Sequence, residues 1–355
     1  MGAAPRGYAG VTLITHGLNG NVDGWVTGMA NRIPKYSQFP GTNSTCYKTF
    51  FYSTGGPYFL GATRVAGNPP QDSPSGEIII KFDWSQLADG NSYNTYQIAQ
   101  VAALALMNTN FIPELGGHAL VEQPLHFIGH SRGGSLVCEL SQQLGTNGIW
   151  VDHLTTLDPH PLNNDGFTLD ALLYSAVDAP ARTYANVLFH DNYWQDLDYF
   201  VHGEPVAGAY VRELNTLSGG YSNPHSNVHL WYHGTIDDRV PTNDTEAALT
   251  ASERANWWSL YEGQGLRAGF YYSRLGVGDR LSAIQPAGVG FPAIRDGYNQ
   301  LWDLGAGVAL NRAGLPANNG TWPSLIRFER TQTNQVVQGQ STPVKLFYQW
   351  ARPTT

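Results

Sequence analysis

Apolar runs alternate with segments of helical spacing along roughly the first 240 residues. Short continuous apolar runs are typical of strands buried on both faces, and apolar residues three and four positions apart are typical of helices. The runs predict strands over 11–15, 78–82, 124–128, 150–157 and 185–189. Helical spacing predicts helices over 24–33, 93–107 and 134–144. This alternation predicts the α/β class, a mostly parallel sheet with helices on both faces.

The pattern changes after Pro241. Thr250 and Glu253 form a capping-box signature before a helix over 255–261. The stretch 263–319 is rich in glycine and has no clear period, and apolar residues then predict a strand pair within about 322–350. We therefore expect an α/β core over 1–245, with an inserted loop at about 191–224. An irregular and partly β C-terminal extension over 246–355 is expected to pack on that core.

Composition excludes several classes of protein. With 42% hydrophobic and 14% charged residues the chain has enough apolar material to exclude disorder as its main state. The net charge of −8 and the lack of any Lys/Arg-rich run exclude a nucleic-acid partner, and no apolar run approaches the ~18 residues of a membrane span. Few lysines, 10 Trp and 19 Tyr are typical of a secreted or periplasmic protein, although no signal peptide is visible in this chain.

The two cysteines, Cys46 and Cys138, permit a single disulfide. Cys138 also fits a buried position on the helix predicted over 134–144, where a cysteine serves as a small apolar residue. Both interpretations remain open at this point.

The segment Gly129-His-Ser-Arg-Gly133 matches G-x-S-x-G. Five letters are weak evidence in a chain with 40 glycines, but this match lies where a predicted strand meets a predicted helix. A nucleophile elbow requires that context, because the turn holds its serine in strained geometry above the carboxyl edge of the sheet. The alternative is a helix N-cap serine in a glycine-rich turn. We predict that Ser131 is a nucleophile.

A nucleophilic serine needs a base, and a neutral imidazole needs an orienting carboxylate. With a nucleophile elbow the chain order is serine, acid, histidine. Asp158 ends the next predicted strand and is the expected acid, whereas Asp152 lies at the wrong end of that strand. Among the later histidines, His225 precedes a predicted helical stretch and is the expected base, with His229 as the alternative.

An oxyanion needs two donors aimed at it in advance. One is expected to be the N–H of Arg132, the residue after the serine, and the other the N–H of Leu18 in the loop after the first strand. The alternative for that loop is a simple glycine turn ending the strand. No step of this chemistry requires a metal, so we expect no cofactor. Several hard ligands do lie close together in sequence and could hold a structural Ca²⁺: Asp158, His160, Asn163, Asn164 and Asp165.

The order of these segments resembles the pancreatic-type lipase family of the α/β-hydrolase superfamily, and in particular a bacterial secreted lipase or esterase. The resemblance rests on Thr15-His-Gly-Leu18 with Trp25, Phe82-Asp-Trp84, Leu125-His-Phe-Ile-Gly-His-Ser-Arg-Gly133, Leu157-Asp-Pro159 and the His225 segment. It covers about residues 10–236 and is specific only in combination. It implies an α/β-hydrolase fold and a carboxylic-ester hydrolase with Ser131, Asp158 and His225 as its triad.

The resemblance also implies that the 191–224 insertion is a lid or pocket loop, whose aromatic residues include the expected substrate contacts Tyr193, Trp194 and Phe200. Arg132 stands where the family has an apolar residue, which leaves the charge preference of the pocket open. The expected partner is a small-molecule or lipid ester, met in solution or by transient contact with a lipid interface. A second hypothesis is a non-catalytic lipid-binding or storage protein on the same fold.

Overall fold

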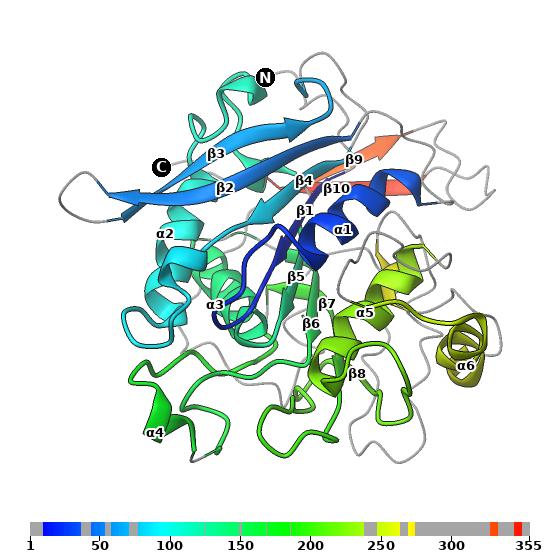
Figure 1. Cartoon of the computed structure of the whole chain (residues 1–355). Helices are drawn as coiled ribbons and strands as arrows, with labels where there is room; N and C mark the ends of the chain where they lie inside the picture. The colour runs from blue at the N-terminus through cyan, green and yellow to red at the C-terminus, as the bar shows by residue number, and fades with distance from the viewer. Residues whose placement is uncertain are drawn as a thin grey trace.

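The computed structural model describes residues 10–36, 44–53, 58–70, 77–123, 125–147, 149, 151–167, 169–184, 186–237, 247–262, 269–273, 327–332 and 344–349. Their centre is an eight-stranded sheet (Figure 1). Along the sheet the strands are β3 (Tyr58–Ala66), β2 (Thr45–Ser53), β4 (Ile78–Phe82), β1 (Val11–Thr15), β5 (Leu125–His130), β6 (Val151–Leu157), β7 (Val187–Trp194) and β8 (Tyr210–Glu213). Every neighbouring pair is parallel except β2 with β3.

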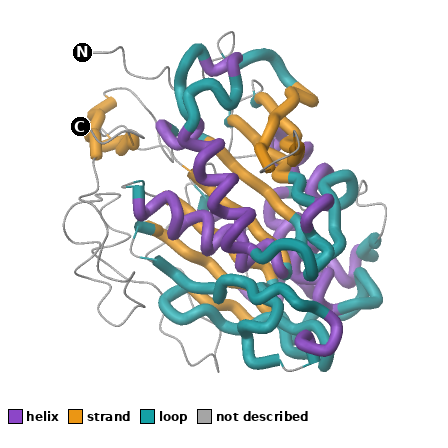
Figure 2. The backbone as a smooth tube through the Cα atoms, turned by 90° about the vertical axis from the view of Figure 1, so that its left-hand side faces the viewer, coloured by secondary structure: helices purple, strands orange, loops and turns teal. Residues whose placement is uncertain are grey.

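The central strands are apolar throughout because helices cover both of their faces. Neighbouring positions alternate between two cores: Leu13 lies in one and Ile14 in the other, and Ile78 and Ile79 divide in the same way. The first core is shared with α2 (Thr95–Met107) and α3 (Arg132–Thr146), and the second with α1 (Trp25–Arg32) and α5 (Pro224–Ile236). Figure 2 shows helices lying across the strands of the sheet. The predicted α/β architecture is confirmed.

Several element boundaries differ from those predicted. The strands β1 and β4 have the predicted bounds, but β5 runs two residues further, through His130 to the serine turn. The helix α3 begins at Arg132 rather than Gly134. Strands β2 and β3 were not predicted, since β2 mixes polar with apolar residues and the second half of β3 is solvent-accessible at the sheet edge.

The remaining elements are short or lie late in the chain. They are α4 (Asp170–Leu173), α6 (Ala251–Glu262), an antiparallel pair of β9 (Arg327–Gln332) with β10 (Val344–Gln349), and 3-10 turns at Ile33–Lys35, Ser85–Leu87, Pro113–Leu115, Leu120–Glu122 and Gly269–Tyr272. The predicted capping box of α6 is formed, because the Glu253 and Thr250 side chains accept each other's backbone N–H at 2.7 and 3.2 Å. Of the glycine-rich stretch 263–319, only 269–273 lie within the described residues.

The helix α6 packs on α5 through its tryptophans. The indole N–H of Trp231 donates to the Trp257 carbonyl at 3.2 Å, and Trp258 donates back to the Trp231 carbonyl at 3.3 Å. A side chain at Gly234 would collide with the Trp258 ring, so glycine permits this close approach. Ala247, Leu249, Trp257 and Trp258 therefore share the core with α1 and α5.

Cys46 and Cys138 are both buried and free. They belong to the two cores on opposite faces of the sheet, so no disulfide joins them. Among the helices of the described residues, none is long and apolar enough to cross a bilayer.

Candidate active site

Ser131 occupies a strained turn between β5 and α3. Its backbone has φ 59° and ψ −130°, in a region that a residue with a Cβ rarely adopts and that costs about 1–3 kcal/mol. The two flanking glycines make the turn sterically accessible. A Cβ on Gly129 would collide with the Gly133 carbonyl, and a Cβ on Gly133 would collide with the carbonyl of His16 in the loop after β1. The structure therefore builds the elbow geometry that the G-x-S-x-G match predicts.

Asp158 and His225 are in direct contact, although 67 residues separate them. Asp158 follows β6 with a positive φ of 47°, and its Oδ2 accepts a hydrogen bond from His225 Nδ1 at 2.6 Å. Asn223 caps α5 by accepting the His225 N–H at 2.9 Å, so His225 stands in the first turn of the helix rather than before it. His229 instead stacks on Trp25 with ring centroids 4.4 Å apart. The carboxylate thus meets His225 and not His229.

The Asp158 carboxylate is fully buried and held by further donors. Gln195 donates its backbone N–H to Oδ1 at 2.8 Å and its side-chain amide to Oδ2 at 2.7 Å, and the Gly203 N–H reaches Oδ1 at 3.0 Å. Burial raises the pKa of the Asp158 carboxyl, and these hydrogen bonds act in the opposite direction. Burial also lowers the pKa of the His225 imidazole. At neutral pH His225 is therefore neutral, and by donating from Nδ1 it keeps a lone pair on Nε2.

The loop after β1 lies directly against the serine. A Cβ on Gly17 would lie 2.6 Å from Ser131 Cβ, which explains why glycine stands there. Trp84 holds this loop by donating its indole N–H to the His16 carbonyl at 3.1 Å and stacking on the His16 ring. Within the described chain, neither the Leu18 N–H nor the Arg132 N–H donates to another residue. Leu18, Arg132 and Ser131 line one cavity, so the use of both amides as oxyanion donors stays a prediction.

Ser131 and His225 line one cavity of about 730 Å³. Most of its wall is apolar, and Leu172, Leu173 and Phe200 at its rim are 79%, 68% and 62% exposed. The rim combines α4 with the loop between β7 and β8. Such a cavity suits a ligand with an uncharged, apolar portion.

Two solved structures are similar to the chain, each at 13% sequence identity. One is described as a "putative cell surface hydrolase" of Lactobacillus plantarum; the match covers 72% of this chain and 90% of that one, with a TM-score of 0.33. The other is a gene product of Listeria innocua, for which the match covers 71% and 94%, with a TM-score of 0.38. No known family model matches the chain, and no curated protein matches it.

The topology of the chain itself decides the fold. A mostly parallel sheet carries a strained serine between a strand and the following helix, then an aspartate after the next strand, then a late histidine. This is an α/β-hydrolase fold. Its ligand-binding region lies outside the carboxyl ends of the strands, where the cavity opens.

Arg132 is among the residues that line that cavity, but its side chain is held inside the protein. It is fully buried, its Nε and Nη2 donate to the two oxygens of Asp178 at 2.6 and 2.9 Å, and its guanidinium lies over the Trp84 ring. Asp178 also accepts the backbone N–H groups of Thr95 and Leu162. The charge is therefore matched inside the protein, and it does not set a charge preference in the pocket of this α/β-hydrolase fold.

The three expected substrate contacts lie in different environments. Phe200 lines the cavity. Tyr193 is fully buried against Trp231, with its hydroxyl donating to Asp191 at 2.8 Å, and Trp194 packs beside Val206 and Val211. Neither reaches the cavity, because both belong to β7.

The expected lid is also narrower than 191–224. Residues 191–194 complete β7 and 210–213 form β8, so only the connections 195–209 and 214–223 can contribute to a cover of the site. The structure adds wall residues that were not predicted: Phe167, Leu169, Leu172 and Leu173 around α4. In the sequence, these residues stand out as a group of apolar side chains within the otherwise polar connection between β6 and β7.

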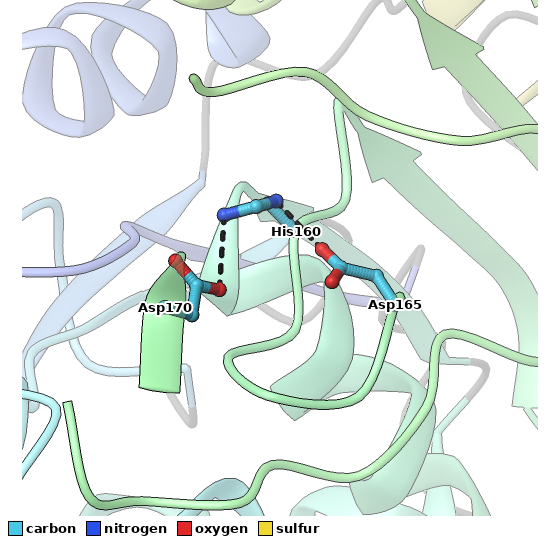
Figure 3. A group of neighbouring side chains, drawn as sticks. All are labelled: His160, Asp165 and Asp170. Atoms are coloured by element: carbon cyan, nitrogen blue, oxygen red, sulfur yellow. Dashed lines mark ion pairs between the residues drawn. The ribbon is translucent and has the colours of Figure 1, made fainter. Parts of the chain in front are cut away.

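The residues considered for calcium are separated by their hydrogen bonds. Asp158 binds His225, and the side-chain amides of Asn163 and Asn164 donate to backbone carbonyls between 174 and 178. His160 and Asp165 remain together, joined by Asp170, which had not been singled out (Figure 3). This cluster lies beside the serine, since the His160 N–H donates to the Ser131 carbonyl at 3.2 Å.

Proposed function

We propose that this chain is a hydrolase of carboxylic esters that acts through an acyl-serine intermediate. The observation that carries the proposal is the 2.6 Å hydrogen bond between His225 Nδ1 and the buried Asp158 carboxylate, in a cavity shared with the strained Ser131. A carboxylate in that place holds the imidazole in the tautomer that leaves Nε2 available as a base.

In the proposed reaction His225 Nε2 takes the proton of the Ser131 hydroxyl as Oγ attacks the ester carbonyl. The resulting oxyanion receives hydrogen bonds from the Leu18 and Arg132 N–H groups. Collapse expels the alcohol, which leaves with the proton from His225. Water, deprotonated in turn by His225, then attacks the acyl-serine and releases the carboxylic acid. Asp158 orients the imidazole throughout through its hydrogen bond to Nδ1.

The apolar wall supports uncharged acyl groups as substrates, from short or medium chains to lipid-like esters. The exposed apolar rim also supports transient contact with a lipid surface, because exposed apolar side chains gathered around a pocket mark an interaction site. We also propose, from composition, that the protein is secreted or periplasmic.

Turnover of p-nitrophenyl esters of graded acyl length tests the reaction. Ser131→Ala should lose at least about 10³-fold in kcat, and Asp158→Asn should lose a similar factor with its fold intact. His229→Gln is the matched control on the same helix and should retain most of the rate. Turnover by Ser131→Ala at the native rate would contradict the proposal.

Labelling by a fluorophosphonate probe separates this function from a lipid-binding or storage protein. The native chain should be labelled at Ser131 and the Ser131→Ala variant should not. Tight binding of a fatty acid without any labelling of the native chain would favour the carrier.

A further inference from the structure

His160, Asp165 and Asp170 gather at one place in the connection after β6. One ligand atom from each lies within 4.8 Å of the others. Asp165 Oδ2 is 2.8 Å from His160 Nδ1, and Asp170 Oδ2 is 3.4 Å from His160 Nε2 (Figure 3). The three side chains come from three points of the chain: the start of the connection, its polar turn, and the first residue of α4.

The polar atoms of this cluster are buried and incompletely paired. The side chains of His160 and Asp170 are only 7% and 6% exposed. Within the described residues, His160 Nδ1 and Asp170 Oδ2 have ion-pair contacts but no hydrogen-bond partner of good geometry. A buried carboxylate oxygen without a donor is costly, and buried charges in proteins are normally paired or bind metals.

The charges of the cluster point to the same kind of ligand. Two carboxylates with a neutral imidazole carry a charge of −2, and even a protonated imidazole leaves −1. A divalent cation would neutralise the two carboxylates and give the unpaired Asp170 oxygen a partner.

We propose that His160, Asp165 and Asp170 form a binding site for a divalent transition-metal ion of the zinc type. One imidazole nitrogen and two carboxylate oxygens are ligands that zinc accepts, with water completing a tetrahedron. Calcium instead takes six to eight oxygen ligands, so the imidazole selects against it. Ligand atoms of a tetrahedral zinc lie about 3.3 Å apart, which is close to the 3.4 Å between His160 Nε2 and Asp170 Oδ2.

The ion would tie the polar connection to α4. His160 donates its backbone N–H to Ser131, and α4 carries Leu172 and Leu173 on the cavity rim. A metal joining His160 to Asp170 would therefore hold the apolar wall at a set distance from the serine. The site stabilises the wall and takes no part in the proposed reaction, so its test is independent of ester hydrolysis.

The test uses the full chain, freed of metal by dialysis against EDTA and titrated calorimetrically with ZnCl₂ or CaCl₂. We expect one Zn²⁺ per chain and no saturable Ca²⁺ binding. Asp170→Asn, Asp165→Asn and His160→Gln should each weaken Zn²⁺ binding by at least about tenfold. Asp170→Asn is nearly isosteric, and thermal unfolding of each variant in EDTA checks that it folds.

Glu204→Gln is the matched control. Glu204 is an exposed carboxylate whose pKa is raised by partial burial and by the nearby charge of Asp165, but it lies outside the cluster. This variant should keep the native affinity, and Co²⁺ bound to the native chain should show visible absorption that Asp170→Asn abolishes. The proposal is overturned by lack of saturable Zn²⁺ binding, by equal affinity in the cluster variants, or by an equal loss in Glu204→Gln.

Discussion

The buried pair of Arg132 and Asp178 offers a quantitative test of how the serine turn is held. Arg132 makes two hydrogen bonds to Asp178 and a third to the Tyr93 carbonyl at 2.5 Å. Asp178 in turn accepts the first N–H of α2, from Thr95, and the N–H of Leu162. The pair thus joins the turn after β5 to the start of α2 and to the connection after β6. We consider the variants Arg132→Met and Asp178→Asn and their combination.

The magnitude follows from the burial of both partners, which are 0% exposed. Removing one partner leaves the other charge uncompensated, which typically costs 3–5 kcal/mol, about a third of the stability of a typical domain. The double variant removes both charges, so we expect it to cost less than the sum of the single variants by up to about 3 kcal/mol. The exposed pair of Lys48 and Asp23 serves as control, and Asp23→Asn should cost under about 1 kcal/mol.

Urea unfolding followed by tryptophan fluorescence measures these differences as changes in free energy of unfolding. Circular dichroism before the titration shows whether each variant starts folded. Single variants that cost no more than Asp23→Asn, or that add without coupling, would refute the claim that the two charges depend on each other.

Three further predictions concern the serine turn and the histidines. Gly133→Ala should abolish ester turnover and destabilise the chain by about 2 kcal/mol or more, since its Cβ would meet the His16 carbonyl; native kinetics would contradict this. The lowered pKa of His225 keeps the imidazole in its base form at mildly acidic pH. The apparent pKa of the acid limb of kcat/KM should therefore lie below the ordinary histidine value of 6.5. An apparent pKa near 7 or higher would contradict a lowered pKa of His225. Burial also lowers the pKa of His130, His229 and His233. Below pH 6.5 the unfolded chain therefore binds more protons than the folded chain, so the free energy of unfolding should fall as the pH drops. With His225 there are four such histidines, and the fall should reach at most about 5 kcal/mol per pH unit. An equal urea midpoint at pH 7 and pH 5 would contradict this.

The strands and helices of the core could be predicted because their signal is local. Ile78–Phe82 is apolar at every position since both of its faces are covered, and the serine turn is written in the spacing of Gly129 and Gly133. The edge strands β2 and β3 escaped prediction, because an edge strand needs neither two apolar faces nor a strict period.

The partners of buried polar groups could not be predicted. Arg132 and Asp178 are 46 residues apart in sequence, and the donors that Gln195 presents to Asp158 come from a different strand connection. The aromatic residues around Tyr193 in the sequence predict a substrate contact. In the structure its side chain is instead buried between the sheet and α5, because its position on β7 points it towards that helix. Such pairings depend on the direction of each side chain, which sequence spacing alone does not specify.

By itself, the sequence determined the α/β class, the α/β-hydrolase order of its segments, and the candidate triad of Ser131, Asp158 and His225, because sterics and apolar periodicity act over a few residues. The tertiary structure decided which histidine meets Asp158, where the charge of Arg132 goes, and that Asp170 joins His160. Each of these outcomes requires segments distant in sequence to meet around a buried charge. Only the packed chain sets which polar groups can reach one another there.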